Sequence, residues 1–325
     1  MLRGMVLTAA FLSCGCFNGL VLTATNVGGP VVETPVADAD HYFCCNKIAL
    51  IDVEGLIVNA KESSILVGTS DNPVSLFRER LDAAADDKRV KAVVLRINSP
   101  GGGVTASDIM YQDLLRFRRA TGKPVVACMM DVAASGGYYL SMGANHVIAH
   151  PTTVTGSIGV IMNMYNATGL ATMLGVSSSP IKSGPNKDIG NPLRPMSETE
   201  RAILQGMVDA FYNQFVEVVV RGRGLPEERV RFLADGRVYT GIDAKKLGLV
   251  DEVGYLEDAI QCAKDMAGIK DAYVVAYDRC EGYRGSIYAA SPKIPAEVRV
   301  KLDLPGMSGP SGAGFMYLWQ AGAPK

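Results

Sequence analysis

Histidine is scarce in this sequence of 325 residues, which contains only His41, His146 and His150. No His-Glu-x-x-His pair and no Cys-x-x-Cys spacing is present, so we expect no metal site of those types and no cofactor. His146 and His150 flank an apolar Val-Ile-Ala run typical of a strand, where their spacing puts both on one face and favours a structural role. A Ser-His-Asp triad is therefore not supported.

Net charge and aromatic content are also low. The formal net charge is −1 and aromatic residues make up 7% of the chain, which gives no electrostatic reason to expect nucleic-acid binding. The seven cysteines are odd in number and irregular in spacing, which argues against a disulfide framework. A hydrophobic content of 48% beside 20% charged residues is ordinary for a globular protein with a sizeable core.

The first 24 residues are predicted to be a signal peptide or a membrane or lipid anchor. The apolar run over residues 5–13 is too short to span a membrane, and Cys14-Gly-Cys16 separates it from a second run at 19–24. The residues before Cys14 loosely resemble a lipobox, and a glycine precedes Cys16. Lipidation of either cysteine and an uncleaved membrane anchor remain open alternatives, and a soluble cytoplasmic protein is a third. We expect a cell-membrane protein with its folded domain outside the cytoplasm.

The rest of the chain is predicted to be one folded domain between two less regular segments. Residues 25–45 read as a linker, 46–281 as the domain, and 282–325 as a Gly/Pro-rich tail with little regular structure. Apolar strands and amphipathic helices alternate within the domain, which predicts an α/β fold of parallel strands with crossover helices. The expected strands lie at 47–53, 90–97 and 125–130, and the expected helices at 73–85, 105–121 and 256–266. A long apolar stripe after the capping box Ser197-Glu-Thr-Glu200 predicts another core-facing helix.

The most informative motif is Asp131-Val-Ala-Ala-Ser-Gly-Gly-Tyr-Tyr139, which directly follows the strand at 125–130. Small residues on both sides of Ser135 allow a sharp turn and are expected to leave its hydroxyl exposed at a strand-to-helix junction. Nearby glycine N–H groups could stabilise an oxyanion, as a nucleophilic serine requires. The glycines at 101–103 also follow a strand and precede a helix, so a tight turn and an oxyanion donor are both open readings.

A serine nucleophile needs a base, and without a suitable histidine the remaining common base is lysine. The Gly/Pro-rich segment at 181–194 carries Lys182 and Lys187. The residues alone favour a solvent-exposed, charged side chain for each of these two lysines. A lysine must be neutral to accept a proton, and burial lowers a lysine pKa by about 3–5 from its ordinary value of about 10.4.

Five motifs in order resemble those of the signal peptide peptidase A family, also called protease IV. They are Asn98-Ser-Pro-Gly-Gly-Gly103, Ala133-Ala-Ser-Gly-Gly-Tyr-Tyr139, Thr155-Gly-Ser-Ile-Gly-Val160, Lys182-Ser-Gly-Pro-Asn-Lys-Asp188 and Gly236-Arg-Val-Tyr-Thr-Gly241. The match runs from about Ile48 to Gly254 and resembles the short, single-unit form. It implies the fold of the Clp protease and crotonase superfamily, built of stacked ββα units.

The resemblance also assigns roles to individual residues. It puts the nucleophile at Ser135 and the general base at Lys187, with Lys182 as a reserve candidate. The hydroxyl that positions the base falls on Ser157. The oxyanion donors fall on Gly102 and Gly136, with Gly101 as an alternative to Gly102.

The leading hypothesis is a membrane-associated Ser/Lys endopeptidase that cleaves hydrophobic peptides, such as signal peptides already released from preproteins. The resemblance further implies a ring-like homo-oligomer, and leaves open whether the lysine serves its own subunit or a neighbouring one. Apolar substrates predict modest pockets that favour Leu or Ala. The alternatives are a crotonase-like acyl-CoA enzyme and a non-catalytic scaffold that binds membrane proteins.

Overall fold

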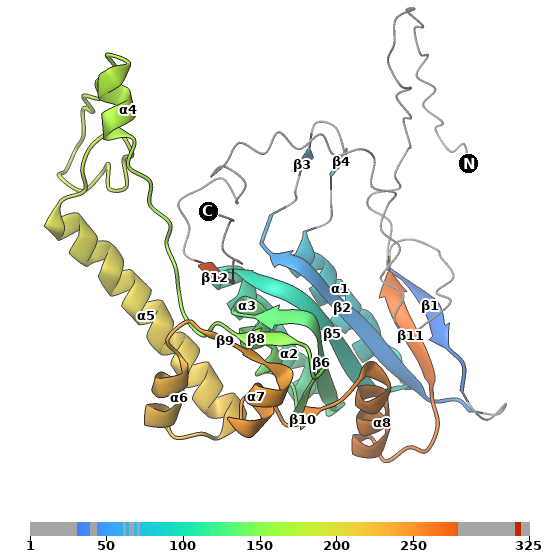
Figure 1. Cartoon of the computed structure of the whole chain (residues 1–325). Helices are drawn as coiled ribbons and strands as arrows, with labels where there is room; N and C mark the ends of the chain where they lie inside the picture. Colours follow the sequence, from blue (N-terminus) through green and yellow to red (C-terminus); the bar gives the residue numbers. More distant parts are fainter. Residues whose placement is uncertain are drawn as a thin grey trace, which may run out of the picture.

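The computed structural model describes residues 31–39, 44–60, 63–64, 68–69, 72–278 and 316–319. A ten-stranded, mostly parallel sheet runs through the molecule in the order β1-β11-β2-β5-β6-β7-β10, with β8 beside β6, β9 beside β8, and β12 beside β5 (Figure 1). The α/β prediction with parallel strands and crossover helices is confirmed. The strands of this sheet are β1 (Val32–Ala37), β2 (Lys47–Ile57), β5 (Val90–Gly103), β6 (Val125–Ala134), β7 (His146–Ala149), β8 (Val154–Gly156), β9 (Val238–Thr240), β10 (Glu252–Val253), β11 (Tyr273–Asp278) and β12 (Met316–Leu318); β3 (Ser63–Ser64) and β4 (Gly68–Thr69) form a separate pair.

The central strands are apolar on both faces because helices cover both sides of the sheet. In β2, Ala49 and Ile51 belong to one core while Ile48 and Leu50 belong to the other. The first core packs against most of the helices, and the second packs against α8. The helices are α1 (Pro73–Asp86), α2 (Val104–Thr121), α3 (Gly136–Ser141), α4 (Thr168–Met173), α5 (Glu198–Arg223), α6 (Glu227–Leu233), α7 (Gly241–Lys246) and α8 (Leu256–Met266).

Local signals explain where several helices begin and end. The predicted capping box at the start of α5 is present, since Ser197 and Glu200 each bond the other's backbone N–H. Gly122 after α2 and Gly224 after α5 have φ of 68° and 63°. This left-handed conformation suits glycine and ends a helix.

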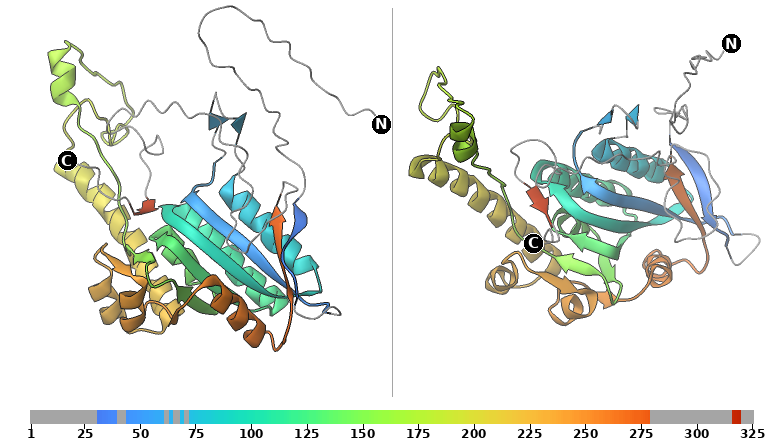
Figure 2. Two further views of the ribbon diagram at one scale, coloured as in Figure 1. Left: turned by 45° about the vertical axis from the view of Figure 1, so that its right-hand side comes forward. Right: turned by 45° about the horizontal axis from the view of Figure 1, so that its top comes forward.

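The segment between β8 and α5 projects from the body as an arm, which we define as residues 162–197 and which includes α4. Figures 1 and 2 show α4 above the N-terminal end of α5, away from the sheet. The prediction that the whole apolar stripe of α5 faces a core is wrong. Its buried apolar side chains all lie in the second half, between Phe215 and Val219, while Ile203 and Met207 in the first half are each 41% exposed. The first half of α5 extends beyond the sheet, so no core element reaches it.

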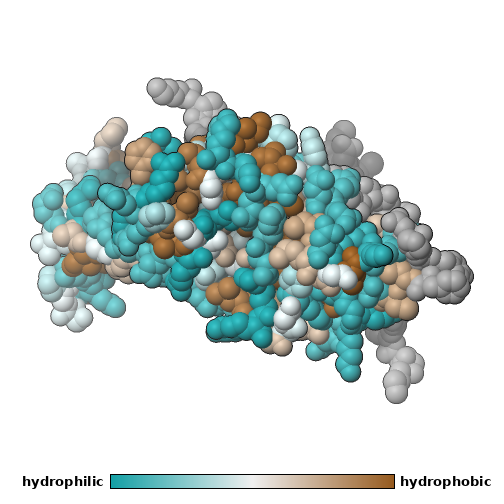
Figure 3. Space-filling view, turned by 90° about the horizontal axis from the view of Figure 1, so that it is seen from below, coloured by the Kyte–Doolittle hydropathy of each residue, from teal (hydrophilic) through white to brown (hydrophobic). Residues whose placement is uncertain are grey.

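The flanking segments contain more structure than the sequence predicted. Within the expected linker, β1 pairs with β11, and within the expected tail, β12 pairs with β5. The predicted anchor at residues 1–24, including Cys14 and Cys16, lies outside the described residues. Among the described helices, none combines the length and apolar character needed to cross a membrane. Seen from below, the molecule is mainly hydrophilic with hydrophobic groups set among the polar side chains (Figure 3).

Candidate active site

Ser135 lies at the end of β6, in the turn that leads into α3. Its backbone has φ 53° and ψ −113°, a conformation that a non-glycine residue rarely adopts. The backbone N–H of Ser135 donates to Gly156 O at 2.8 Å and its carbonyl accepts from Tyr139 N at 2.8 Å, so both sides of the turn are held. The expectation of an exposed hydroxyl is wrong: Ser135 is 1% exposed, because the end of β8 packs beside the turn. Its hydroxyl has no hydrogen-bond partner among the described residues. A serine with a strained backbone and an unpartnered hydroxyl has the geometry expected of a nucleophile whose general base is not in contact with it.

The candidate oxyanion donors meet beside this turn. A Cβ built on Gly136 would lie 2.4 Å from Ser107 Oγ, 3.1 Å from Gly102 N and 3.2 Å from Gly101 Cα. A Cβ on Gly102 would lie 2.0 Å from Ile57 O. Only glycines allow these two segments to approach this closely, and the approach places Gly102 N beside Gly136, the residue that follows Ser135.

Ser157 occupies the matching position on the neighbouring strand. Ala134 of β6 pairs with Gly156 of β8, so Ser135 and Ser157 are the next residues on two adjacent strands. Ser157 also has a positive φ, of 49°, and its N–H donates to Arg237 O at 2.8 Å. The fold therefore brings together the predicted nucleophile, the oxyanion donors and the base-positioning hydroxyl.

Both candidate lysines lie on the arm, which Figure 1 shows standing away from α3. Lys182 forms an ion pair with Asp188, so its amine already has a partner within the arm. Lys187 is exposed, and no ion pair or side-chain hydrogen bond involves it within the described residues. The chain by itself therefore leaves Lys187 and Ser135 apart.

An ion-pair network that was not predicted from the sequence holds the loop that carries Lys187. Arg194 bonds Asp188 on one side and Glu200, at the start of α5, on the other. Hydrogen bonds from Arg194 and then Lys182 lower the pKa of Asp188, and the Arg194 guanidinium lowers the pKa of Glu200 to about 2. The Asp188 carboxylate is thus committed to Arg194 and Lys182 instead of Lys187. The signal in the sequence was an arginine with an acidic residue on each side of it.

His146, the first residue of β7, and His150, the residue directly after β7, lie away from the turn at Ser135. β7 pairs with Val126–Met129, near the opposite end of β6 from Ser135. His146 Nε2 lies 3.5 Å from Glu252, and the His150 ring packs edge-on against Tyr255. Both make local contacts of the kind expected for a structural role.

Comparison with known proteins identifies the family. The sequence model of "Peptidase family S49" matches residues 117–270, and that of "Clp protease" matches residues 58–155. A putative signal peptide peptidase SppA from Enterococcus faecium is 38% identical over 231 residues, which are 71% of this chain and 67% of the relative. A putative protease from Synechocystis is 40% identical over 223 residues (69% and 75%), and a chloroplastic serine protease SPPA from Arabidopsis thaliana is 36% identical over 225 residues (69% and 33%). The chain therefore belongs to peptidase family S49, a family of serine proteases.

Proposed function

We propose that this protein is a membrane-associated Ser/Lys endopeptidase that cleaves hydrophobic peptides, including signal peptides released from preproteins. The observation that supports this proposal most strongly is the strained turn at Ser135. Its hydroxyl is buried and unpartnered among the described residues, and the turn is adjacent to the candidate oxyanion donors of Gly102 and Gly136. The name of the Enterococcus relative supports the substrate class. The membrane attachment rests on the sequence of residues 1–24 alone.

Lys187 acts as the general base in this proposal and comes from a neighbouring subunit. The arm that carries it stands away from Ser135 of its own chain, and several large apolar side chains on it are exposed. Leu170, Met173 and Leu174 are 60%, 85% and 69% exposed, and Ile181 is fully exposed. Contiguous exposed apolar side chains mark a surface that buries against a partner. A second copy that covers this surface would put Lys187 in a dry environment, where the neutral amine is favoured.

The chemistry follows the usual two steps of a serine peptidase. The neutral Lys187 amine takes the proton of the Ser135 hydroxyl while Oγ bonds to the substrate carbonyl carbon. The N–H groups of Gly102 and Gly136 stabilise the negative charge on the carbonyl oxygen. Lysine then returns the proton to the leaving amine as the C–N bond breaks. Water, deprotonated by the same lysine, releases the acyl group from Ser135 and restores its hydroxyl.

Hydrolysis of a fluorogenic apolar peptide by three variants tests the proposal. Ser135→Ala and Lys187→Ala should each lower kcat/KM by about 10⁴-fold or more. Lys182→Ala should retain most activity, because an exposed ion pair contributes about 0–1 kcal/mol. Labelling by a fluorophosphonate should be lost in Ser135→Ala and in Lys187→Ala and kept in Lys182→Ala, because the reagent reacts with a Ser135 hydroxyl that Lys187 has activated. Loss of activity in His146→Gln or His150→Gln with an unchanged melting temperature would refute the Ser/Lys assignment.

A further inference from the structure

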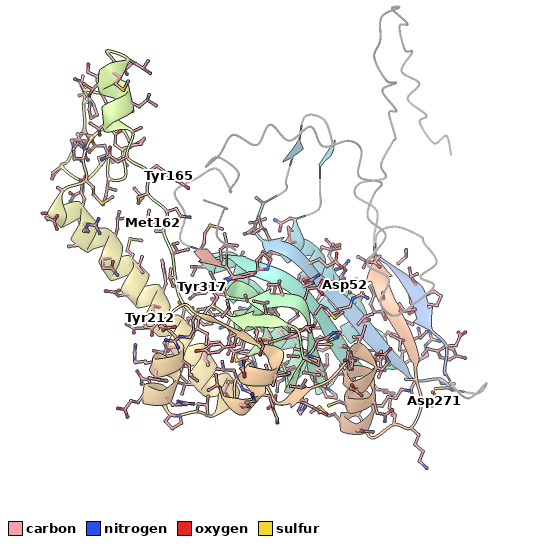
Figure 4. The ribbon with its side chains drawn as sticks, in the orientation of Figure 1. Asp52, Met162, Tyr165, Tyr212, Asp271 and Tyr317 are labelled. Atoms are coloured by element: carbon pink, nitrogen blue, oxygen red, sulfur yellow. The ribbon has the colours of Figure 1, made fainter. Side chains whose placement is uncertain are left out.

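The candidate oxyanion donor Gly102 lies in a segment whose own residues do not fix its conformation. Three consecutive glycines, at 101–103, follow Pro100, and glycine adopts more backbone conformations than other residues. In Figure 4, Tyr317 marks this end of β5, because β12 pairs Tyr317 with Gly102. An oxyanion donor is effective only when its N–H points at the position that the substrate oxygen occupies in the transition state. Another group must therefore hold these glycines in place.

The buried hydroxyl of Ser99 contacts this glycine segment. Ser99 is 0% exposed, and its Oγ accepts a hydrogen bond from Gly101 N at 3.1 Å. The same hydroxyl donates to Gly55 O, on β2, at 2.6 Å. A serine hydroxyl has one proton to donate, so a bond to Gly55 leaves its lone pairs for the Gly101 N–H. Ser99 thereby ties the first glycine of the segment to β2, at φ 100°.

A bulge between β2 and β5 explains why a side chain is needed at this point. The pairing of the two strands shifts by one residue here, so that Gly55 of β2 lies opposite both Ser99 and Pro100 of β5. A bulge interrupts the backbone hydrogen bonds of the sheet, and Pro100 has no N–H to donate. The Ser99 hydroxyl gives the Gly55 carbonyl a partner where the backbone of β5 offers none from Pro100.

Ser99 also contacts the helix that carries the second candidate donor. A Cβ built on Gly137 would lie 2.9 Å from Ser99 O and 3.5 Å from Ser99 Cβ. Gly137 directly follows Gly136, and a Cβ built on Gly101 would lie 2.6 Å from Gly136 N. Ser99 therefore touches the residue before one donor, Gly102, and the residue after the other. This position lets one buried side chain set how the two N–H groups lie relative to each other.

We propose that Ser99 is a positioning residue for the oxyanion hole, and that its hydroxyl holds the Gly101 peptide so that the Gly102 N–H points at the substrate oxygen beside that of Gly136. The inference deepens the proposed function and rests on it. It also chooses between the two donors that the sequence left open, because the Gly101 N–H already bonds Ser99. Without the hydroxyl, the buried Gly101 N–H would lose its partner, and the glycine segment would rotate to find another.

A transition-state analogue tests this role separately from substrate binding. The probe is a trifluoromethyl ketone built on the same apolar peptide as the hydrolysis substrate. Ser135 Oγ bonds to the ketone carbon, its proton passes to Lys187, and the negative charge moves to the ketone oxygen, where the oxyanion donors stabilise it. Ser99→Ala should weaken inhibition by the ketone and lower kcat/KM by the same factor, about 10–100-fold, because a donor is misplaced but not removed.

Binding of the uncleaved peptide provides the readout that the proposed role should not affect. Its affinity is measured by fluorescence anisotropy on a Ser135→Ala background, with and without Ser99→Ala. The two affinities should agree within about twofold, because the oxyanion forms only in the transition state. Ser141→Ala is the matched control: Ser141 is also 0% exposed, and its Oγ donates to Tyr138 O at 2.7 Å within α3. This control should change neither the inhibition by the ketone nor the peptide affinity.

Equal inhibition of the wild type and Ser99→Ala by the ketone would overturn the inference. An equal loss of affinity for the ketone and for the uncleaved peptide would also overturn it, since Ser99 would then support the groove as a whole. If Ser99→Ala does not fold, Ser99→Cys replaces it and should weaken inhibition in the same direction, because a thiol is only a weak donor and acceptor. A wild type that neither hydrolyses the peptide nor binds the ketone refutes the peptidase, and with it the role of Ser99. Hydrolysis that depends on Ser135 but not on Ser99 refutes only the role of Ser99.

Discussion

At the scale of single residues, Ser135 has a strained backbone conformation at the centre of the site. Its φ of 53° and ψ of −113° lie in a region that costs about 1–3 kcal/mol. The sequence predicted a sharp turn here from the alanines and glycines around Ser135. It could not predict that Gly136 packs against Ser107 and Gly102, because these contacts join distant segments. The strain is retained because the sheet on one side and α3 on the other both fix the turn.

Ser157 is expected to position the base. Ser157→Ala should lower kcat about two- to tenfold, the effect of one lost hydrogen bond of about 0.5–1.5 kcal/mol. It should also move the pH profile of kcat, since the hydroxyl would no longer orient the lysine. Ser177→Ala removes an exposed hydroxyl from the arm and serves as the control. An unchanged pH profile together with a lowered melting temperature would assign Ser157 a structural role only.

The pH dependence of hydrolysis reports the identity of the base. A lysine accepts a proton only after losing its own, so kcat/KM should rise from neutral to alkaline pH. The measurement is a pH series with one fluorogenic peptide and a stability check at each pH. A flat profile, or a maximum at about pH 5–6, would indicate another group such as histidine or a carboxylate.

At the scale of elements, the arm depends on the ion pairs that Arg194 makes with Asp188 and Glu200. Arg194→Ala should release the loop around Lys187, increase its cleavage by trypsin at Lys182 and Lys187, and lower kcat. The rest of the domain should keep its melting temperature, since the network lies outside the two cores. Arg201→Ala removes an exposed arginine from the same end of α5 and should leave the loop protected. Equal trypsin sensitivity in the two variants would show that Arg194 does not hold the arm.

Acidification should weaken the same contact. The pKa of Glu200 falls from an ordinary value of 4.5 to about 2 in the folded chain, mainly through its hydrogen bonds with Arg194. A lowered carboxyl pKa stabilises the folded state above pH 4.5, and this contribution is lost as the pH falls toward 2. The difference in urea midpoint between the wild type and Glu200→Gln should therefore shrink over that range. A difference that stays constant down to pH 2 would show that the ionised form of Glu200 adds no stability.

Elements with strong local signals could be predicted, and those that depend on distant partners could not. The capping box of α5 and the glycines that end α2 and α5 could be predicted because each acts within a few residues. The exposure of Ile203 and Met207 could not be predicted, because periodicity identifies an apolar face of a helix but not what covers that face. β12 was also missed, since three residues pair with a strand more than two hundred positions earlier in the chain.

At the scale of the whole molecule, the proposed Ser/Lys site requires assembly of several subunits. The exposed apolar residues of the arm and the separation of Lys187 from Ser135 both predict a homo-oligomer, and a repeated head-to-tail contact would close into a ring. Light scattering of the folded protein should give several times the mass of 34.6 kDa for one chain. Charged substitution at Met173 and Leu174, at the tip of the arm, should lower that mass and the activity together. A fully active monomer would rule out a shared site.

Mixing two inactive variants tests the shared Ser/Lys site most directly. Ser135→Ala and Lys187→Ala proteins are co-assembled from separated subunits at equal concentration, and mixed oligomers are verified by mass spectrometry. If each active site joins Ser135 of one subunit to Lys187 of the next, random assembly should restore about a quarter of wild-type activity. Each variant assembled alone should remain inactive. Verified mixed oligomers without any recovered hydrolysis would contradict the account.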